Sequence, residues 1–459
     1  MRRAIVHGPA LVEAELPDDT EVVSPGLALP LPPTEDLSTE IARALDEPLD
    51  GPPLKERVRH GMRVLVAFDD PTVPCYAPLW ATALPLIVDA LAAGGIAETD
   101  ISLLCANSLH RRFTHNELAR TIGPELVARF RDRLTCHDGE DPDGLEHLGT
   151  TASGYDVVLS KRAVEADLVV YLNCSTTRGF SGGWKSICVG LSSYQSIRHH
   201  HTPDTMSMSL DRNRMHEMLD EMGALTERRL GADRFFKLET VLSDPLQVHR
   251  IFSGSVGAAR RAALDAQRAH LPARRDLLRD KADVVVYGVP DWSPYAAFSH
   301  TNPVLDLIST GLGYLGGMIE AAGRPGCTVV LATPCPLRFN LDHHPAYAEA
   351  WEELLPVTDV EQTRRLYEHD YATRADHIER YRFGNAFHPV HAVMALYPLK
   401  RLRHAGRVIV AAPDDPAVPA RIGFDSEPTV ERAVAAARAD HGPDARVVLV
   451  DYPLVFNRS

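Results

Sequence analysis

One short segment of the chain concentrates residue types that could do chemistry. Residues 174–201 read CSTTRGFSGGWKSICVGLSSYQSIRHHH. Glycines let backbone approach a ligand closely, and Lys185 follows them, directly before the apolar run Ser186–Leu191. A lysine in apolar surroundings has its neutral amine favoured, so it can act as a nucleophile that attaches a cofactor covalently. A surface lysine that caps a loop is the competing interpretation.

Histidines are the other candidate groups. His199, His200 and His201 are consecutive. Adjacent side chains point in different directions on any regular element, so at most two of them could share a metal ion. A solvated polar turn is the alternative. His110 follows the apolar run of residues 101–106, where an imidazole would suit a general base near neutral pH. A partly buried structural histidine would look the same.

Two nucleotide-binding patterns fail on their context. Residues 179–186 resemble a Walker A loop, but Trp184 stands where that loop needs glycine before the lysine. Residues 311–316 fit G-x-G-x-x-G, yet they follow a segment that looks helical, whereas the dinucleotide motif must follow a strand and open a helix. We therefore expect neither site to bind a nucleotide.

The elements around these residues alternate between strands and helices. Apolar runs predict strands at 62–68, 101–106 and 167–173, and a helix at 77–93. A second series follows, with strands at 284–288, 328–332, 407–412 and 446–451 and helices at 304–322, 346–355, 360–369 and 427–440. This alternation predicts an α/β fold with mainly parallel sheets. Ligands bind at the carboxyl ends of such strands, which points to the loops at 69–74, 107–114 and 174–190.

The chain is long enough for more than one domain. It has 459 residues, of which 45% are hydrophobic. An Ala- and Arg-rich helical stretch at 256–281 is the best candidate for a connector. We therefore predict an N-terminal cofactor-binding and catalytic domain at 1–278, and a C-terminal domain at 279–459 that completes a substrate cleft between the two.

Composition excludes several classes of protein. A net charge of −14 disfavours a nucleic-acid binder. Seven scattered cysteines without a CxxC pair exclude a zinc ribbon, and the absence of a signal-like or membrane-spanning apolar run favours the cytoplasm. Only six of the 48 basic residues are lysines, so a lysine in an unusual setting is informative.

At these residues the chain resembles the lactate racemase family, whose members are nickel-pincer-nucleotide-dependent 2-hydroxyacid racemases and epimerases. The similarity runs through IARALDEPLDGPPL, MRVLVAFDDPT, NSLHRRFT, GFSGGWKSICVG and YQSIRHHH, and weakens toward the C-terminus. The most specific feature is the GFSGGxK block followed sixteen residues later by histidine.

The resemblance implies specific roles. Lys185 matches the lysine that is linked covalently to the cofactor, a pyridinium mononucleotide with two sulfur-containing arms. His201 matches the histidine that ligates its nickel, and His110 matches one of two histidine bases. Asp70, Thr72, Val73 and Val189 are expected beside the cofactor. Catalysis would transfer a hydride from the carbon that bears the hydroxyl and return it to the other face.

The chain departs from the family pattern on the substrate side. Ser175 stands at the position of the second histidine base, and Val73 replaces an arginine that helps to bind the substrate carboxylate. No lysine occurs between Lys281 and Lys400, where the family has a second cation. A buried carboxylate without a paired charge is costly, so simple lactate is not the expected substrate. Candidate replacements are the cations Arg178, Arg111 and Arg112, the aromatic residues Trp184, Trp292 and Tyr295, and, as the second base, His199 or His200.

These observations lead to a racemase- or epimerase-like enzyme that acts on an α-hydroxy compound other than lactate. Its partners would be that small molecule and the cofactor-synthesis enzymes, with no nucleic acid or membrane, and the sequence allows a homo-oligomer. An alternative is a carrier or sensor that binds the cofactor, or a related nucleotide, without turnover. A metal-dependent hydrolase using the histidine run is the third hypothesis, and it lacks an HExxH-like motif.

Overall fold

The computed structural model describes residues 1–24, 31–73, 78–175, 180–206, 213–244, 247–269 and 280–452. The chain divides into two compact units. Unit 1 comprises residues 1–29, 271–377 and 388–459, and unit 2 comprises residues 30–270 and 378–387. The predicted division at 278/279 placed the N-terminus with the first domain, whereas residues 1–29 belong to the unit that holds the C-terminal half.

Unit 2 is built on a six-stranded sheet in the order β11-β10-β9-β4-β5-β6. All neighbouring strands are parallel except the β10–β11 pair. The strands are β4 (Val64–Asp69), β5 (Ile101–Ala106), β6 (Leu134–Cys136), β9 (Leu168–Ser175), β10 (Phe235–Asp244) and β11 (Gln247–Gly254), and a separate hairpin pairs β7 (Leu145–Thr150) with β8 (Asp156–Ser160).

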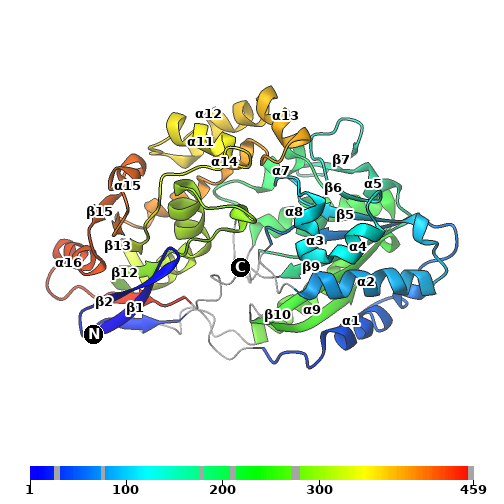
Figure 1. Ribbon diagram of the computed structural model, residues 1–459, viewed down its shortest axis with the longest axis horizontal. Coiled ribbons are helices and arrows are strands. Elements are labelled where there is room, and N and C mark those ends of the chain that lie inside the picture. Colours follow the sequence, from blue (N-terminus) through cyan, green and yellow to red (C-terminus); the bar gives the residue numbers. More distant parts are fainter. Residues whose placement is uncertain are drawn as a thin grey trace. The chain divides into compact units, whose positions relative to one another are not determined.

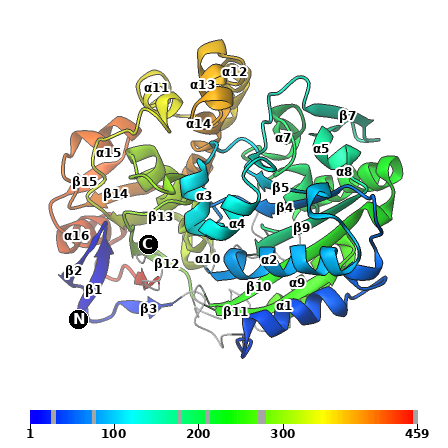
Figure 2. The same cartoon turned by 45° about the vertical axis from the view of Figure 1, so that its right-hand side comes forward.

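Helices cover this sheet with their apolar sides. Every residue of β9 is buried, as expected for a parallel strand packed on both faces. The helix α9 packs on β10 and β11, while α1 and α2 lie side by side (Figures 1 and 2). The helices are α1 (Leu37–Asp46), α2 (Pro78–Ala93), α3 (His115–Ile122), α4 (Pro124–Arg129), α5 (Lys161–Glu165), α6 (Trp184–Cys188), α7 (Tyr194–His200), α8 (Arg214–Leu230) and α9 (Val256–Ala269).

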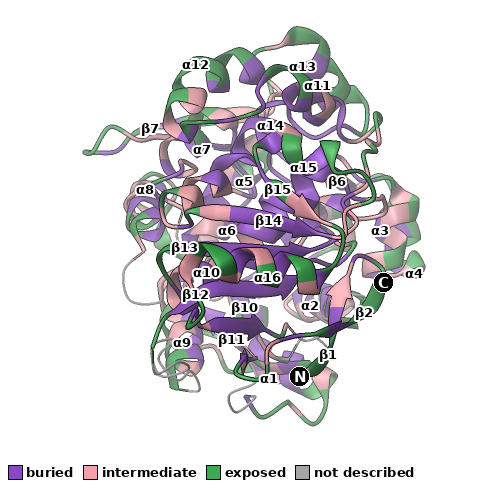
Figure 3. Ribbon diagram, turned by 90° about the vertical axis from the view of Figure 1, so that its left-hand side faces the viewer, coloured by how far each residue is buried: buried purple, intermediate pink, exposed green. Residues whose placement is uncertain are grey.

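Unit 1 is built on a second six-stranded sheet, in the order β15-β14-β13-β12-β16-β3, in which all pairs are parallel. Figure 3 shows its central strands β12, β13 and β14 in the buried colour. The strands are β3 (Glu21–Val23), β12 (Ala282–Gly288), β13 (Gly323–Ala332), β14 (Arg407–Ala411), β15 (Asp425–Glu427) and β16 (Val447–Val450), and a hairpin pairs β1 (Arg2–His7) with β2 (Ala10–Glu15).

The helices of unit 1 differ from the prediction in one segment. The predicted helix at 304–322 is broken into a π-helical segment, η6 (Val304–Tyr314), a short 3₁₀ turn (Gly316–Met318) and α10 (Ile319–Ala322). Gly311, Gly313 and Gly316 lie in this segment and open no helix after a strand. The other helices are α11 (Pro345–Glu353), α12 (Val360–Ala372), α14 (Val390–Met394), α15 (Ala417–Ile422) and α16 (Val430–His441), and α13 (Ala375–Phe383) spans the boundary with unit 2.

The predicted α/β class with mainly parallel sheets is confirmed. The strands that were not predicted are β1, β2, β3, β6, β7, β8, β10, β11 and β15. β3 pairs with β16 from the far end of the chain, and such a distant pairing leaves no local signal in a three-residue strand. No helix among the described residues is long and apolar enough to cross a membrane.

Candidate active site

The sheet of unit 2 reverses its strand order at β4. From β4 the chain builds β5 and β6 on one side and β9, β10 and β11 on the other. Parallel sheets bind ligands at such a switch point, outside the carboxyl ends of the strands. The loops after β4, β5 and β9 carry Asp70, His110 and Lys185, respectively. The three predicted loops therefore meet at one edge of one sheet.

Asp69, the last residue of β4, joins β4 to β9. Its carboxylate accepts the Cys174 amide at 3.0 Å and the Tyr171 hydroxyl at 3.0 Å. Burial raises the pKa of Asp69 to about 6, while the nearby Lys237 ammonium acts in the opposite direction. Asp69 thus places a buried negative charge directly beneath the switch point.

His110 is held by Asp70 in the geometry of an oriented general base. Its Nδ1 donates to Asp70 Oδ2 at 2.7 Å, and Thr72 Oγ1 lies 2.9 Å from the same nitrogen. Asp70 is buried and also accepts the backbone amide of Thr72 at 2.7 Å and its hydroxyl. A proton fixed on Nδ1 leaves the Nε2 lone pair to take a proton, which is the arrangement that a base requires.

Lys185 lies in the first turn of α6, beyond two glycines with positive φ, Gly182 at 90° and Gly183 at 59°. Its side chain is half-buried, and Nζ lies 4.3 Å from the centre of the Phe180 ring. Burial lowers the pKa of Lys185 to about 8; Asp69 raises it and Arg260 lowers it further. A larger fraction of the amine is therefore neutral and nucleophilic near neutral pH. Arg178 lies outside the described residues.

The histidine run occupies the end of α7. His200 is fully buried, and its Nδ1 lies 2.8 Å from Nδ1 of His201, which caps the helix. Burial lowers the pKa of His200 to about 3, so this ring stays neutral. A proton on His201 Nδ1 would place the lone pair of this ring on Nε2, which is the form in which a histidine can ligate a metal ion. His199 instead faces Asp156, with 3.5 Å between Nε2 and the carboxylate.

The two valines expected beside a cofactor lie in these same segments. Val73 is in the turn after β4, where its amide donates to Asp70 O at 3.0 Å. Val189 is the C-cap of α6, four residues after Lys185, and its amide donates to Lys185 O at 3.0 Å. Both side chains are half-buried. The side chain of Val73 cannot supply the positive charge that an arginine would bring to this position.

Ser175, at the position of the family's second base, is tied into the protein. Its hydroxyl is buried and donates to Glu239 Oε1 at 3.1 Å. A serine needs a partner that removes its proton in order to act as a base or a nucleophile. The carboxylate here accepts that hydrogen bond from within the sheet, so the contact holds Ser175 in place.

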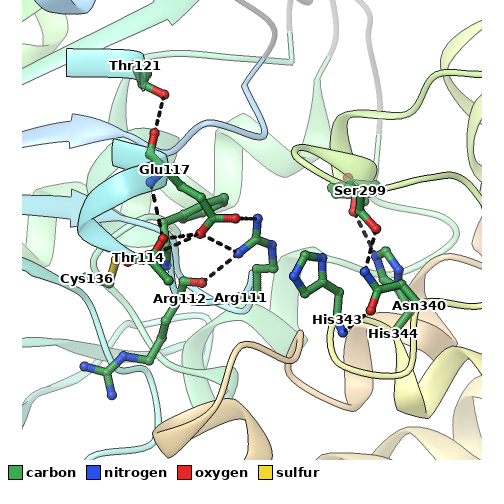
Figure 4. Close-up of polar contacts among 12 residues, drawn as sticks. Arg111, Arg112, Thr114, Glu117, Thr121, Cys136, Ser299, Asn340, His343 and His344 are labelled. Atoms are coloured by element: carbon green, nitrogen blue, oxygen red, sulfur yellow. Dashed lines mark hydrogen bonds and ion pairs between the residues drawn. The ribbon is translucent and has the colours of Figure 1, made fainter. Parts of the chain in front are cut away.

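Arg111 is a buried structural residue. Its guanidinium makes two hydrogen bonds to Glu117, at 2.7 and 3.2 Å, and lies 4.3 Å from the centre of the Phe113 ring (Figure 4). Glu117 also closes the capping box of α3 with Thr114. The predicted role of Arg111 as a substrate cation would require this pair to open. Arg112 donates to the backbone oxygen of Arg382.

Trp292, the other tentative substrate contact, belongs to unit 1. It follows β12, is half-buried and packs against the Tyr314 ring with 6.4 Å between centroids. The Trp292 carbonyl accepts the hydroxyl of Thr310 at 3.2 Å. Because Trp292 follows β12, it lies on a loop at the carboxyl end of the unit 1 sheet.

Another loop contact in unit 1 joins Asn340 to Ser299: the Asn340 side chain donates to Ser299 Oγ at 2.8 Å (Figure 4).

A group of buried charged residues on β10 and α9 was not identified from the sequence. Lys237 and Glu239 are fully buried on β10, and Arg260 on α9 pairs with Glu239 at 3.3 Å. The signal was present in the segment FFKLETVL, where two charges two residues apart interrupt an otherwise strand-like run. Residues i and i+2 share one face of a strand, so this pattern indicated buried charges on one side of β10.

Comparison with known proteins identifies relatives for part of the chain. A family model described as the lactate racemase N-terminal domain matches residues 8–212. Lactate racemase from Lactiplantibacillus plantarum is 26% identical over 230 residues, covering 49% of this chain and 52% of that protein. Lactate racemase from Thermoanaerobacterium thermosaccharolyticum is 30% identical over 164 residues, covering 35% of this chain and 37% of that protein. The matched segments thus span about half of these relatives or less.

Solved structures extend the similarity of fold to nearly the whole chain. The lactate racemase apoprotein from Thermoanaerobacterium thermosaccharolyticum has a TM-score of 0.69 at 19% identity and covers 98% of both chains. A Thermotoga maritima protein solved by a structural genomics consortium has a TM-score of 0.57 at 14% identity, covering 92% of this chain and 96% of that chain. At these identities the likeness shows the fold alone.

Proposed function

The chain is a divergent member of the lactate racemase family, and from this premise we propose that it is a nickel-pincer-nucleotide-dependent racemase or epimerase of a 2-hydroxy compound other than lactate. The observation that carries the proposal is the meeting, at one sheet edge, of an oriented His110–Asp70 pair with Lys185, an amine whose pKa is lowered. The first supplies a base and the second an attachment point.

The residues at this edge fit the attachment of such a cofactor. Lys185 offers a nucleophilic amine, and His201 offers an imidazole whose other nitrogen contacts His200. Gly182 and Gly183 let the loop backbone pass where side chains would collide: a Cβ on Gly182 would lie 2.1 Å from Glu239 Oε1, and one on Gly183 would lie 3.1 Å from Arg260. Asp70 and Thr72 border the same edge. When bound, the cofactor supplies a group that accepts a hydride and returns it.

The chain's own groups handle the proton. His110 Nε2 takes the proton of the substrate hydroxyl, while Asp70 stabilises the resulting imidazolium through the 2.7 Å hydrogen bond to Nδ1. When the carbonyl is reduced again, His110 would give the proton back to the same oxygen. Inversion would follow if reduction took place on the opposite face of the carbonyl carbon.

Three features favour a substrate other than lactate. Val73 lies where the family has a cation, Arg111 is bound to Glu117, and residues 282–399 contain no lysine. A lactate carboxylate bound at this edge would find valine in place of a cation at position 73 and an Arg111 that is already paired with Glu117, at a cost of several kcal/mol. We therefore propose a substrate that is larger, less charged or held through hydroxyl groups.

Intact-mass spectrometry after co-expression with the cofactor-synthesis enzymes tests the attachment. We expect an added mass on the wild-type chain, located by peptide mapping at Lys185, together with bound nickel. Lys185→Ala should carry neither, while Lys55→Ala, which changes an exposed lysine of the same unit, should carry both. An unmodified Lys185 without nickel would refute the proposal.

A second candidate function is a cofactor carrier or sensor without turnover. The contact between Ser175 and Glu239 favours it, because the family's second base is replaced by a hydroxyl that is used structurally. Chiral chromatography across a panel of 2-hydroxy acids separates the two functions. Inversion of any acid by the loaded protein supports the enzyme, and loading without inversion of any of them supports the carrier.

A further inference from the structure

A carboxylate and a guanidinium lie beneath the loop that carries Lys185. Glu239 is fully buried on β10, and Arg260, on α9, is nearly so. Neither residue belongs to the base or to the attachment point described above. Burying an ion pair costs desolvation energy that only good geometry and further hydrogen bonds repay, so the contacts of this pair indicate its role.

Glu239 accepts one hydrogen bond from the end of β9 and one from the residue that caps α6. Its Oε2 accepts the amide of Gly183 at 2.8 Å, and its Oε1 accepts the hydroxyl of Ser175 at 3.1 Å. Ser175 ends β9, before the loop, and Gly183 stands two residues before Lys185. One buried carboxylate therefore ties the end of a central strand to the residue that caps α6.

Arg260 holds the same loop from a second element. Its guanidinium donates to the carbonyl oxygen of Ser181 and lies 3.3 Å from Glu239 Oε1. His216, on α8, adds a third contact, because its Nε2 donates to the carbonyl of Phe180 at 3.0 Å. The ring of Phe180 in turn lies under the Lys185 amine. Residues 180–183 are thus fixed from β10, α9 and α8.

We propose that Glu239 and Arg260 are positioning residues for Lys185: they hold residues 181–183 in place and so keep the amine in the half-buried position where a cofactor can be attached. This inference rests on the proposed function for its purpose. Its physical content, the placement of one amine, is measurable without any cofactor.

The charge of Arg260 adds to its geometry. The charged groups that act on Lys185 are Asp69 and Asp70, which favour the ammonium form, and Arg260, which disfavours it. His200 and His216 also lie near this amine, and both stay neutral because burial lowers the pKa of each to about 3. Removing the guanidinium should therefore make Lys185 harder to deprotonate.

The test measures Lys185 in the cofactor-free protein. Acetylation by limiting sulfo-N-hydroxysuccinimide acetate at pH 7.5 is followed by peptide mass spectrometry, with exposed Lys55 as the internal standard. We expect Arg260→Gln to lower the Lys185/Lys55 rate ratio at least fivefold and Arg260→Lys to restore it to within twofold. Charge rescue of this kind separates electrostatic positioning from simple packing.

Hydrogen exchange tests the carboxylate. Glu239→Gln keeps the shape but cannot accept from Ser175, Gly183 and Arg260 together, so we expect the Gly183 amide to exchange at least tenfold faster. The matched control is Glu40→Gln. Glu40 is a buried carboxylate of the same unit that pairs with Arg43 at 2.7 Å and accepts the Ile251 amide at 2.8 Å, and neither partner is in the loop.

Three results would overturn this positioning role: an Arg260→Lys variant as slow as Arg260→Gln, a Glu239→Gln variant with Gly183 exchange within twofold of wild type, or equal effects from Glu40→Gln. A different result refutes the proposed function: an unmodified Lys185 after co-expression with the cofactor-synthesis enzymes. If the labelling results are as expected but no cofactor mass is found, Glu239 and Arg260 position Lys185 and the proposed purpose of that positioning is wrong.

Discussion

Asp70→Asn is the sharpest perturbation of the proposed base. In the wild-type chain Asp70 accepts from His110 Nδ1 at 2.7 Å and from the Thr72 amide at 2.7 Å through different oxygens. An asparagine can keep the contact with Thr72 and turn its NH₂ toward His110. That donor then requires a lone pair on Nδ1, so the proton moves to Nε2 and the base is lost.

The expected size of the effect follows from the bond that is removed. A hydrogen bond to a charged group contributes about 1.5–3 kcal/mol, and 1.36 kcal/mol corresponds to a factor of ten in rate. We therefore expect kcat to fall by at least roughly 10- to 150-fold. Thr72→Val removes the hydroxyl that lies 2.9 Å from the same nitrogen and donates to the other oxygen of Asp70, but it leaves the hydrogen bond between His110 and Asp70 in place. Because the bond that keeps the proton on Nδ1 remains, we expect a smaller loss in kcat, of roughly tenfold or below.

Two measurements check this prediction. Chiral chromatography gives kcat on the best acid of the panel, and ¹⁵N chemical shifts report which ring nitrogen of His110 carries the proton, whatever the substrate is. We expect the Nδ1–H form in wild type and in Thr72→Val, and the Nε2–H form in Asp70→Asn. A folded Asp70→Asn protein that keeps the Nδ1–H form, or more than half of the wild-type kcat, would refute the reasoning.

Three further changes probe the packing around the site. Gly182→Ala should lower the free energy of unfolding in urea by about 2 kcal/mol more than Gly154→Ala does. The backbone φ is about +90° at both glycines, but only at Gly182 would the new Cβ meet a carboxylate oxygen. Equal losses in the two variants would contradict this clash. Lys237 is buried with its pKa lowered to about 8 from 10.5. At a pH between these two pKa values the unfolded chain binds more protons than the folded chain. The free energy of unfolding of wild type, relative to that of Lys237→Met, should therefore rise with pH by up to about 3 kcal/mol. If urea unfolding from pH 7.5 to 10 gives a constant difference between the two proteins, the prediction is wrong. Arg111→Ala should cost about 1.5–3 kcal/mol by removing the hydrogen bonds to Glu117, with KM unchanged, whereas a raised KM in an equally stable variant would make Arg111 a substrate contact.

Local pattern was sufficient for the central parallel strands of both sheets, β4, β5 and β9 in unit 2 and β12, β13, β14 and β16 in unit 1. The strand predicted at 101–106 is β5, and the predicted helix at 77–93 is α2 within one residue. Both segments are strongly apolar, and their length separates strand from helix. Lys185 and His110 became candidates for a related reason: each follows a strand that local composition identifies, and in parallel sheets the loops at these ends bind ligands.

Segments whose structure depends on distant partners were not predictable in this way. The helix expected at 304–322 is a broken π-helical segment, and the short β3 exists only because β16 lies beside it. The segment FFKLETVL shows that two charges share a strand face, but not that Arg260 and the amide of Gly183 are there to meet one of them.

The sequence by itself determined the α/β class, the family resemblance and the candidate residues for attaching a cofactor, since each of these is written in short stretches of chain. The tertiary structure decided which of those candidates have the neighbours that the proposed chemistry needs. It set Asp70 against His110 across 40 residues, tied Ser175 to Glu239 across 64, and used Arg111 to hold Glu117. The physical reason is that proton transfer and the binding of charge depend on distances of about 3 Å, and folding alone brings distant side chains that close.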